Sequence, residues 1–170
     1  LLLETVGEAK GVEAAATQPG HLYVADGAGG VWASDDDGAS WRQENEGLDT
    51  TSVSGVSVGQ DRLYAGTQGS GVFVGTVAPD GSISWDGSDS PRVFVHRIQI
   101  EVDPRDGDRL YASSYPGGVL RSDDGGRTWS AKNFLTPSIR VDDPNVQGYY
   151  AMDIDPTRPD TVWLGVYGKG

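Results

Sequence analysis

The sequence predicts an all-β protein, a β-propeller built from four-stranded antiparallel blades, and three observations support this fold class. Apolar segments are short and interrupted by glycine, of which there are 25 in 170 residues. No segment shows sustained helical periodicity, so strands alternating with helices are excluded. A strand-and-turn unit recurs at a nearly fixed interval, and four short strands in about 40–45 residues is the size of a propeller blade.

Tryptophan marks the repeat. Trp41, Trp85 and Trp129 are each separated by 44 residues. A strand-like segment recurs at 21–25, 62–66, 109–113 and 161–165, and a glycine-rich turn follows each copy. After the first three turns the chain returns as a strand, and alternating segments at 53–58, 98–103 and 151–155 precede the later copies. One unit therefore reads strand, turn, strand, glycine turn, strand, tight turn, strand.

The repeat divides the chain into approximate blades at 12–50, 51–95, 96–148 and 149–170, and the last of these is incomplete. Propellers typically close with 4–8 blades. We therefore expect a single propeller region that is part of a larger propeller, with its remaining blades supplied by the same chain or by a partner chain.

The tight turn carries the most specific motif. Residues 34–41 and 122–129 both read Ser-x-Asp-x-Gly-x-Ser/Thr-Trp. A third copy at 78–85 keeps Asp80, Ser84 and Trp85 but lacks the first serine and the central glycine. Short Asp and Ser side chains can accept backbone N–H bonds within their own turn, and glycine allows a positive φ. The tryptophan can bury a large apolar surface between neighbouring sheets.

This pattern resembles the Asp-box, or BNR, repeat of sialidases and their relatives, and the chain is also similar to sortilin, photosystem II assembly factor and xyloglucanase propellers. In such proteins the box joins the third and fourth strands of a blade, on the face opposite the usual active site. The resemblance therefore implies a structural role for the motif residues. These are Ser34, Asp36, Gly38, Ser40, Trp41, Asp80, Ser84, Trp85, Ser122, Asp124, Gly126, Thr128 and Trp129.

The resemblance places ligand binding on the opposite rim, formed by the glycine turns and the loops between blades. The side chains that we expect to bind a ligand there are Gln68, Tyr115, Tyr149, Tyr167 and Lys169.

Asp26 is the candidate catalytic residue, because residues 22–32 look like the segment that holds one catalytic Asp in xyloglucanase-type glycosidases. The spacing from Asp to Gly-Gly is one residue longer here. An inverting glycosidase needs a second carboxylate roughly 6.5–9.5 Å away, and no second match appears in the sequence. The arginine triad of a sialidase is not assembled either.

Charge and composition limit the partners. The formal net charge is −12, and aspartate supplies 19 of the 25 acidic residues whereas lysine occurs three times, a balance that resembles proteins of salt-loving archaea. This charge argues against nucleic acid or an anionic membrane surface as partner. No apolar run is long enough to insert in a membrane. Both an extracellular and a cytoplasmic location remain open.

Metal and cofactor signals are weak. The chain has no cysteine, which excludes disulfides and Cys-ligated zinc. The acidic stretches at 35–38 and 103–108 lack the alternating oxygens and final Glu of an EF-hand loop. We therefore expect no metal and no cofactor.

Two functional classes follow. The favoured one is a non-catalytic propeller that binds a protein or a carbohydrate through its loop rim, or serves as a scaffold. The alternative is a glycoside hydrolase of the xyloglucanase or sialidase type, with part of its active site outside this chain.

Overall fold

The computed structural model describes residues 9–14, 19–90, 98–114, 118–131, 134–136, 139–140, 146–158 and 160–168, which form strands and turns only. Within these residues no helix is long and apolar enough to cross a membrane.

Three four-stranded antiparallel sheets form the body of the protein, and each is a simple meander in chain order. We call them blades 1, 2 and 3. Blade 1 comprises β1 (Ala9–Ala14), β2 (Leu22–Asp26), β3 (Gly30–Ser34) and β4 (Arg42–Gln43). Blade 2 comprises β5 (Val53–Val58), β6 (Leu63–Thr67), β7 (Gly71–Val77) and β8 (Ile83–Gly87). Blade 3 comprises β9 (Ile98–Asp103), β10 (Asp106–Ser114), β11 (Gly118–Ser122) and β12 (Ser130–Ala131).

Two smaller sheets follow blade 3. The strands β13 (Phe134–Thr136) and β14 (Ile139–Arg140) pair with each other, in a segment where the repeat predicts no separate hairpin. The strands β15 (Val146–Ile154) and β16 (Val162–Gly168) form the sheet that corresponds to the first half of a fourth blade.

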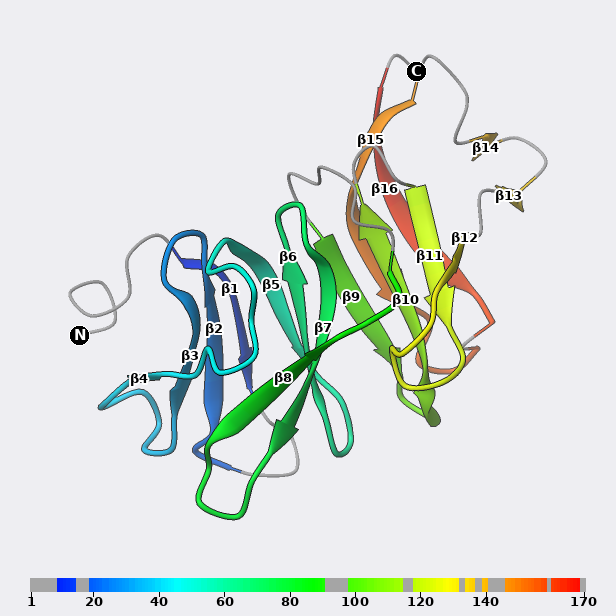
Figure 1. Ribbon diagram of the computed structural model, residues 1–170. Coiled ribbons are helices and arrows are strands. Elements are labelled where there is room, and N and C mark those ends of the chain that lie inside the picture. Colours follow the sequence, from blue (N-terminus) through cyan, green and yellow to red (C-terminus); the bar gives the residue numbers. More distant parts are fainter. Residues whose placement is uncertain are drawn as a thin grey trace.

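The sheets stand side by side in chain order (Figure 1). In blades 1 to 3 and the β15–β16 sheet, the first strand of each contacts the first strand of the next, so that β1, β5, β9 and β15 lie in succession. Polar side chains also join these strands. The Ser57 hydroxyl donates to the Ile100 carbonyl at 2.6 Å, and the Gln99 amide bonds both the N–H and the carbonyl of Met152. This succession of first strands is the arrangement expected around a propeller axis.

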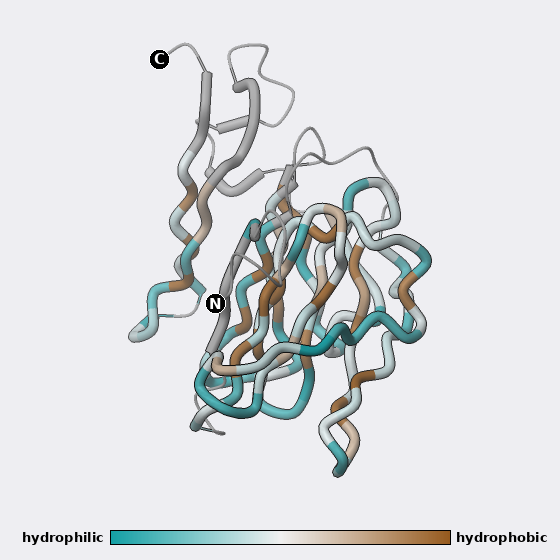
Figure 2. The backbone as a smooth tube through the Cα atoms, turned by 90° about the vertical axis from the view of Figure 1, so that its left-hand side faces the viewer, coloured by the Kyte–Doolittle hydropathy of each residue, from teal (hydrophilic) through white to brown (hydrophobic). Residues whose placement is uncertain are grey.

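The hydrophobic core lies between the sheets, in three separate clusters. Apolar residues follow the strands and polar residues gather at the turns (Figure 2). Successive side chains of a strand point to opposite faces, so the second strands of blades 2 and 3 each contribute to two clusters. In blade 2, Leu63 and Ala65 pack toward Tyr23 of blade 1, whereas Tyr64 packs toward Leu110 and Ala112 of blade 3.

The same rule continues into the β15–β16 sheet with one difference. Val162 and Leu164 pack toward Tyr111 of blade 3. Trp163 points to the other face and has 62% of its surface exposed. Among the described residues no further sheet covers this face, which elsewhere in the protein is the contact between blades.

Candidate functional site

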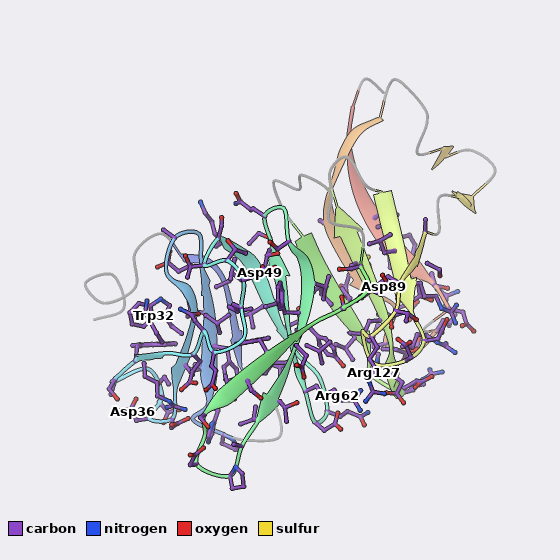
Figure 3. The ribbon with its side chains drawn as sticks, viewed as in Figure 1. Trp32, Asp36, Asp49, Arg62, Asp89 and Arg127 are labelled. Carbon is purple, nitrogen blue, oxygen red and sulfur yellow. The ribbon has the colours of Figure 1, made fainter. Side chains whose placement is uncertain are left out.

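The candidate rim is the end of the blades that carries the β2–β3 and β6–β7 turns. Figure 3 labels Asp49 at this end, between blades 1 and 2, and Asp36 at the opposite end, in the tight turn of blade 1. The β2–β3 turn spans residues 26–30 and the β6–β7 turn spans residues 67–71.

Asp26 ends β2 and is buried, with 3% of its surface exposed. Its Oδ1 accepts a hydrogen bond from the Ala28 N–H at 3.0 Å, which closes the turn locally. Because Gly29 has no Cβ, Asp26 Oδ2 and Trp32 Nε1 come within 2.5 and 2.8 Å of the place a Cβ would occupy. Trp32 Nε1 is itself buried and has no hydrogen-bond partner among the described residues. The carboxylate is therefore part of the turn.

Thr67 occupies the equivalent position in blade 2. Asp26 pairs with Gly30 across the turn, and Thr67 pairs with Gly71 in the same register. Thr67 is fully buried, and its hydroxyl donates to the Gly71 carbonyl at 2.7 Å. A residue without a carboxylate therefore closes the corresponding turn of the next blade.

Two polar residues that the sequence analysis did not single out hold these turns from the following loop. Asn45 Oδ1 accepts from the Val31 N–H at 2.8 Å, and Ser90 Oγ accepts from the Val72 N–H at 2.8 Å. A Cβ on Gly30, at φ +86°, would lie 2.2 Å from Asn45 Oδ1. Glycine is required there both by its backbone conformation and by this close approach.

Glu44 is a third residue that the sequence analysis missed, and it joins blades 1 and 2. Its carboxylate accepts from Arg42 Nε at 2.7 Å and from the Ile83 N–H at 2.9 Å. Its backbone carbonyl accepts from Trp85 Nε1 at 2.8 Å. In the sequence, only its position three residues after the motif residue Trp41 marks Glu44.

Of the five rim residues expected to bind a ligand, the structure describes the side chain of one and the backbone of two more. Gln68 lies in the β6–β7 turn with an exposed side chain, and its N–H donates to the Ser52 carbonyl at 2.9 Å. The backbones of Tyr149 and Tyr167 lie in the paired strands β15 and β16. Tyr115 and Lys169 lie outside the described residues. The structure therefore places Gln68 near the Asp26 end of the blades, and the side chains of the other four lie outside what it describes.

The tight turns of blades 1 and 3 share one hydrogen-bond pattern. In blade 3 the Ser122 hydroxyl donates to Asp124 Oδ1 at 2.8 Å and accepts from the Gly126 N–H at 2.9 Å. Asp124 also accepts from the Thr128 N–H and hydroxyl, and Trp129 Nε1 donates to the Gly126 carbonyl. Blade 1 repeats every one of these bonds with Ser34, Asp36, Gly38, Ser40 and Trp41.

These bonds hold the two carboxylates in their ionised form. Hydrogen bonds from Ser40, with that from Ser34, lower the pKa of Asp36 to about 2. Hydrogen bonds from Thr128, followed by that from Ser122, lower the pKa of Asp124 to about 2. A carboxylate that accepts several bonds within its own turn is suited to stabilising that turn, and not to taking up a proton near neutral pH.

The third copy of the motif has different bonds. Asp80 accepts from the Ser82 N–H at 3.0 Å and the Ser82 hydroxyl at 2.6 Å, whereas Ser84 is exposed and pairs with Thr76 across the hairpin. The tryptophan of this copy, Trp85, donates its indole N–H to Glu44 of blade 1 and not to its own turn. The blade 2 hairpin is therefore held by the neighbouring blade.

Metal ligands do not gather in the described part of the chain. No group of three or more His, Asp or Glu side chains there could hold a metal ion.

Several solved structures resemble the chain. An ancestral GH74 enzyme aligns with a TM-score of 0.71 and 20% identity over 94% of this chain and 22% of that one. The GH74 xyloglucanase from Xanthomonas campestris gives 0.64 and 19% identity over 95% and 28%. YCF48 bound to D1 peptide gives 0.53 and 20% identity over 93% and 46%. The chain thus spans about a quarter of each GH74 protein and less than half of YCF48.

No family model and no curated protein matches the sequence. At these identities the structural likeness shows the fold alone. The chain therefore has a β-propeller fold.

Proposed function

We propose that the chain is part of a β-propeller that binds a protein or a carbohydrate through the rim carrying the β2–β3 and β6–β7 turns, without catalysing a reaction there. The observation that supports this most is the state of Asp26. A general acid or base must come within hydrogen-bond reach of its substrate, whereas Asp26 is buried and accepts a bond within its own turn. Thr67 closes the next turn at the same position, so the position does not require an acid.

The fold supports a binding role of this kind. YCF48 was solved bound to D1 peptide and shares the blade architecture over 93% of this chain. Loops at one end of a rigid β scaffold are a common place for binding residues. Gln68 is exposed on such a loop and can both donate and accept hydrogen bonds.

Calorimetric titration of the chain with xyloglucan oligosaccharides and with the D1 peptide tests the proposal, because one probe is a carbohydrate and the other a peptide. We expect one of them to bind and Gln68→Ala to weaken its binding. Asp160→Ala is the control, since Asp160 is 91% exposed in the turn between β15 and β16, at the opposite end of the protein. Equal losses in both variants, or binding of neither probe, would contradict rim binding.

Glycoside hydrolysis is the second candidate function, and the likeness to the two GH74 proteins favours it. On this alternative Asp26 supplies one carboxylate and the second comes from elsewhere in the propeller. Turnover assays with β-glucan and sialoside substrates distinguish the two functions. Asp26→Asn keeps the oxygen that accepts a hydrogen bond from the Ala28 N–H, so the turn should stay intact. Hydrolysis by the parent that is lost in this variant would show that the rim catalyses a reaction.

A further inference from the structure

The space between blades 1 and 2 is hollow at the Asp-box end, away from the rim. A cavity of about 650 Å³ lies there. Ligand pockets commonly enclose roughly 300–1,000 Å³, so this cavity has the size of a binding site. Its walls are the start of β2 with His21 and Tyr23, Asp35 after β3, the β5–β6 turn at 58–63, and the β7–β8 turn at 77–81.

The corresponding space between blades 2 and 3 is smaller, because the Asp box of blade 3 packs into it and leaves a cavity of about 150 Å³. A Cβ on Gly126 would lie 3.0 Å from the Tyr64 ring and 3.2 Å from Val74, so the turn backbone packs directly on blade 2. A Cβ on the neighbouring Gly125 would lie closer still to Arg62 Nη1, and the Gly125 N–H donates to the Asp108 carbonyl at 2.9 Å. The complete box of blade 3 thus leaves less space beside the preceding blade than the incomplete copy in blade 2 does.

The incomplete motif of blade 2, at residues 78–85, explains why the space between blades 1 and 2 is open. In blade 2 the positive φ belongs to Gly81 and not to the residue at the position of Gly126, which is Ser82. The strands β7 and β8 remain paired as far as Val77 and Ile83, and their hairpin projects beyond the sheet (Figure 1). Arg42 Nη2 of blade 1 donates to the Gly81 carbonyl at 2.9 Å, which ties the hairpin tip across the opening.

Three carboxylates surround the cavity, on Asp35, Asp61 and Asp80. The basic groups nearby are Arg62, His21 and, at the opening, Arg42. Asp35 is already paired, with His21 Nδ1 at 3.0 Å and with Arg42. Asp61 has 73% of its side chain exposed and lies 3.8 Å from Arg62 Nε, beyond hydrogen-bond distance. The cavity mouth therefore presents carboxylate oxygens with spare accepting capacity, in a protein of net charge −12.

We infer that this cavity binds the side chain of an arginine or lysine carried by a peptide segment of a partner protein. The cation enters between the two blades, its head group pairs with Asp61, and its aliphatic stem lies along the partly buried Val58 and Val77. Tyr23 is nearly inaccessible, and its burial, followed by Asp35, raises the pKa of its hydroxyl, which leaves a neutral wall at the base. This site is separate from the proposed rim and does not depend on it.

Titration with blocked tripeptides that carry arginine or glutamine at the centre tests the inference, with binding followed by NMR chemical shifts of the cavity residues. We expect the arginine peptide to bind more tightly than the glutamine peptide. Asp61→Asn removes one charge without a change of shape and should weaken arginine binding about fivefold, as loss of an ion pair worth about 1 kcal/mol predicts. Ala78→Trp fills the cavity without changing a charge and should abolish binding.

Asp160→Asn is the matched control. Asp160 is 91% exposed at the same end of the protein and pairs with Arg109 at 3.1 Å, and it lies in the turn between β15 and β16. This variant should bind the arginine peptide as the parent does. Equal affinity for the glutamine peptide, equal losses in Asp61→Asn and Asp160→Asn, or unchanged binding in Ala78→Trp would each overturn the inference.

Discussion

Two aromatic residues at equivalent positions differ in what covers them, and this difference predicts a difference in stability. Tyr111 in β10 is 5% exposed and packs with Met152 and Ile154 of the next sheet. Trp163 in β16 occupies the same place in its sheet and is 62% exposed. We therefore compare Tyr111→Ala with Trp163→Ala, and we expect the smaller tyrosine to be the more important residue.

The magnitudes follow from the buried area. Aromatic side chains bury about 150–250 Å² in a core, and each Å² of apolar area removed from water is worth about 25 cal/mol. Tyr111 is almost wholly buried, so its truncation should cost about 4–5 kcal/mol in the free energy of unfolding. Trp163 keeps roughly two-fifths of its surface from water, which corresponds to about 2 kcal/mol. The expected difference is about 2–3 kcal/mol, or about 4–12 °C in Tm.

Urea denaturation followed by circular dichroism measures the loss in the free energy of unfolding for each variant. Sedimentation at the same protein concentration determines whether the chain is monomeric. Equal costs for Tyr111→Ala and Trp163→Ala in a monomer would refute the argument that the face of Trp163 is open. If the chain is joined to a further sheet, the cost of Trp163→Ala should rise toward that of Tyr111→Ala. That comparison tests whether further blades cover this face, as the repeat predicts.

Three further changes test the turns. Ser122→Ala leaves the Gly126 N–H without its side-chain acceptor and should lower the free energy of unfolding by about 1–3 kcal/mol, measured by urea denaturation. Gly30→Ala places a Cβ at positive φ against Asn45, and we expect a loss of more than about 1 kcal/mol in the same assay. The pKa of Asp124 is lowered to about 2 in the folded protein, so its contribution is present above its unfolded pKa of about 3.9 and is lost as pH falls toward 2. The fall in stability between pH 4 and pH 2 should therefore be shallower in Asp124→Asn; equal slopes would contradict this assignment.

The sequence was sufficient for the strand repeat, and the reason is geometric. Trp85 and Trp129 each pack against the preceding blade, at the same place in their own blades. The 44-residue spacing of the tryptophans therefore equals the number of residues in one blade repeat. The Ser and Asp of each complete box lie close together in sequence, so the bonds of Ser122 and Asp124 can be anticipated from local spacing alone.

Contacts between a loop and a turn distant in sequence could not be anticipated in this way. Asn45 and Ser90 perform the same task, but Asn45 lies four residues after Trp41 and Ser90 lies five after Trp85. One side chain is an amide and the other a hydroxyl, so neither spacing nor residue type repeats. The burial of Asp26 was also invisible in the sequence, because a similar motif can present the carboxylate or fold it into the turn.

The blade 2 hairpin shows what an Asp box contributes beyond local stability. Ser122 and Asp124 hold their turn with side chains of that turn, so its backbone is compact enough to pack on the preceding blade. The blade 2 hairpin lacks the first serine and the central glycine of the motif, keeps the bonds of Asp80 with Ser82, and is also tied to Glu44 and Arg42 of blade 1. The larger cavity lies beside this hairpin, so we attribute the open space to the incomplete motif. Loss of motif residues from one box is therefore a route by which a repeated structural element can acquire a binding site, at the end of the propeller where the complete box of blade 3 packs on the preceding blade.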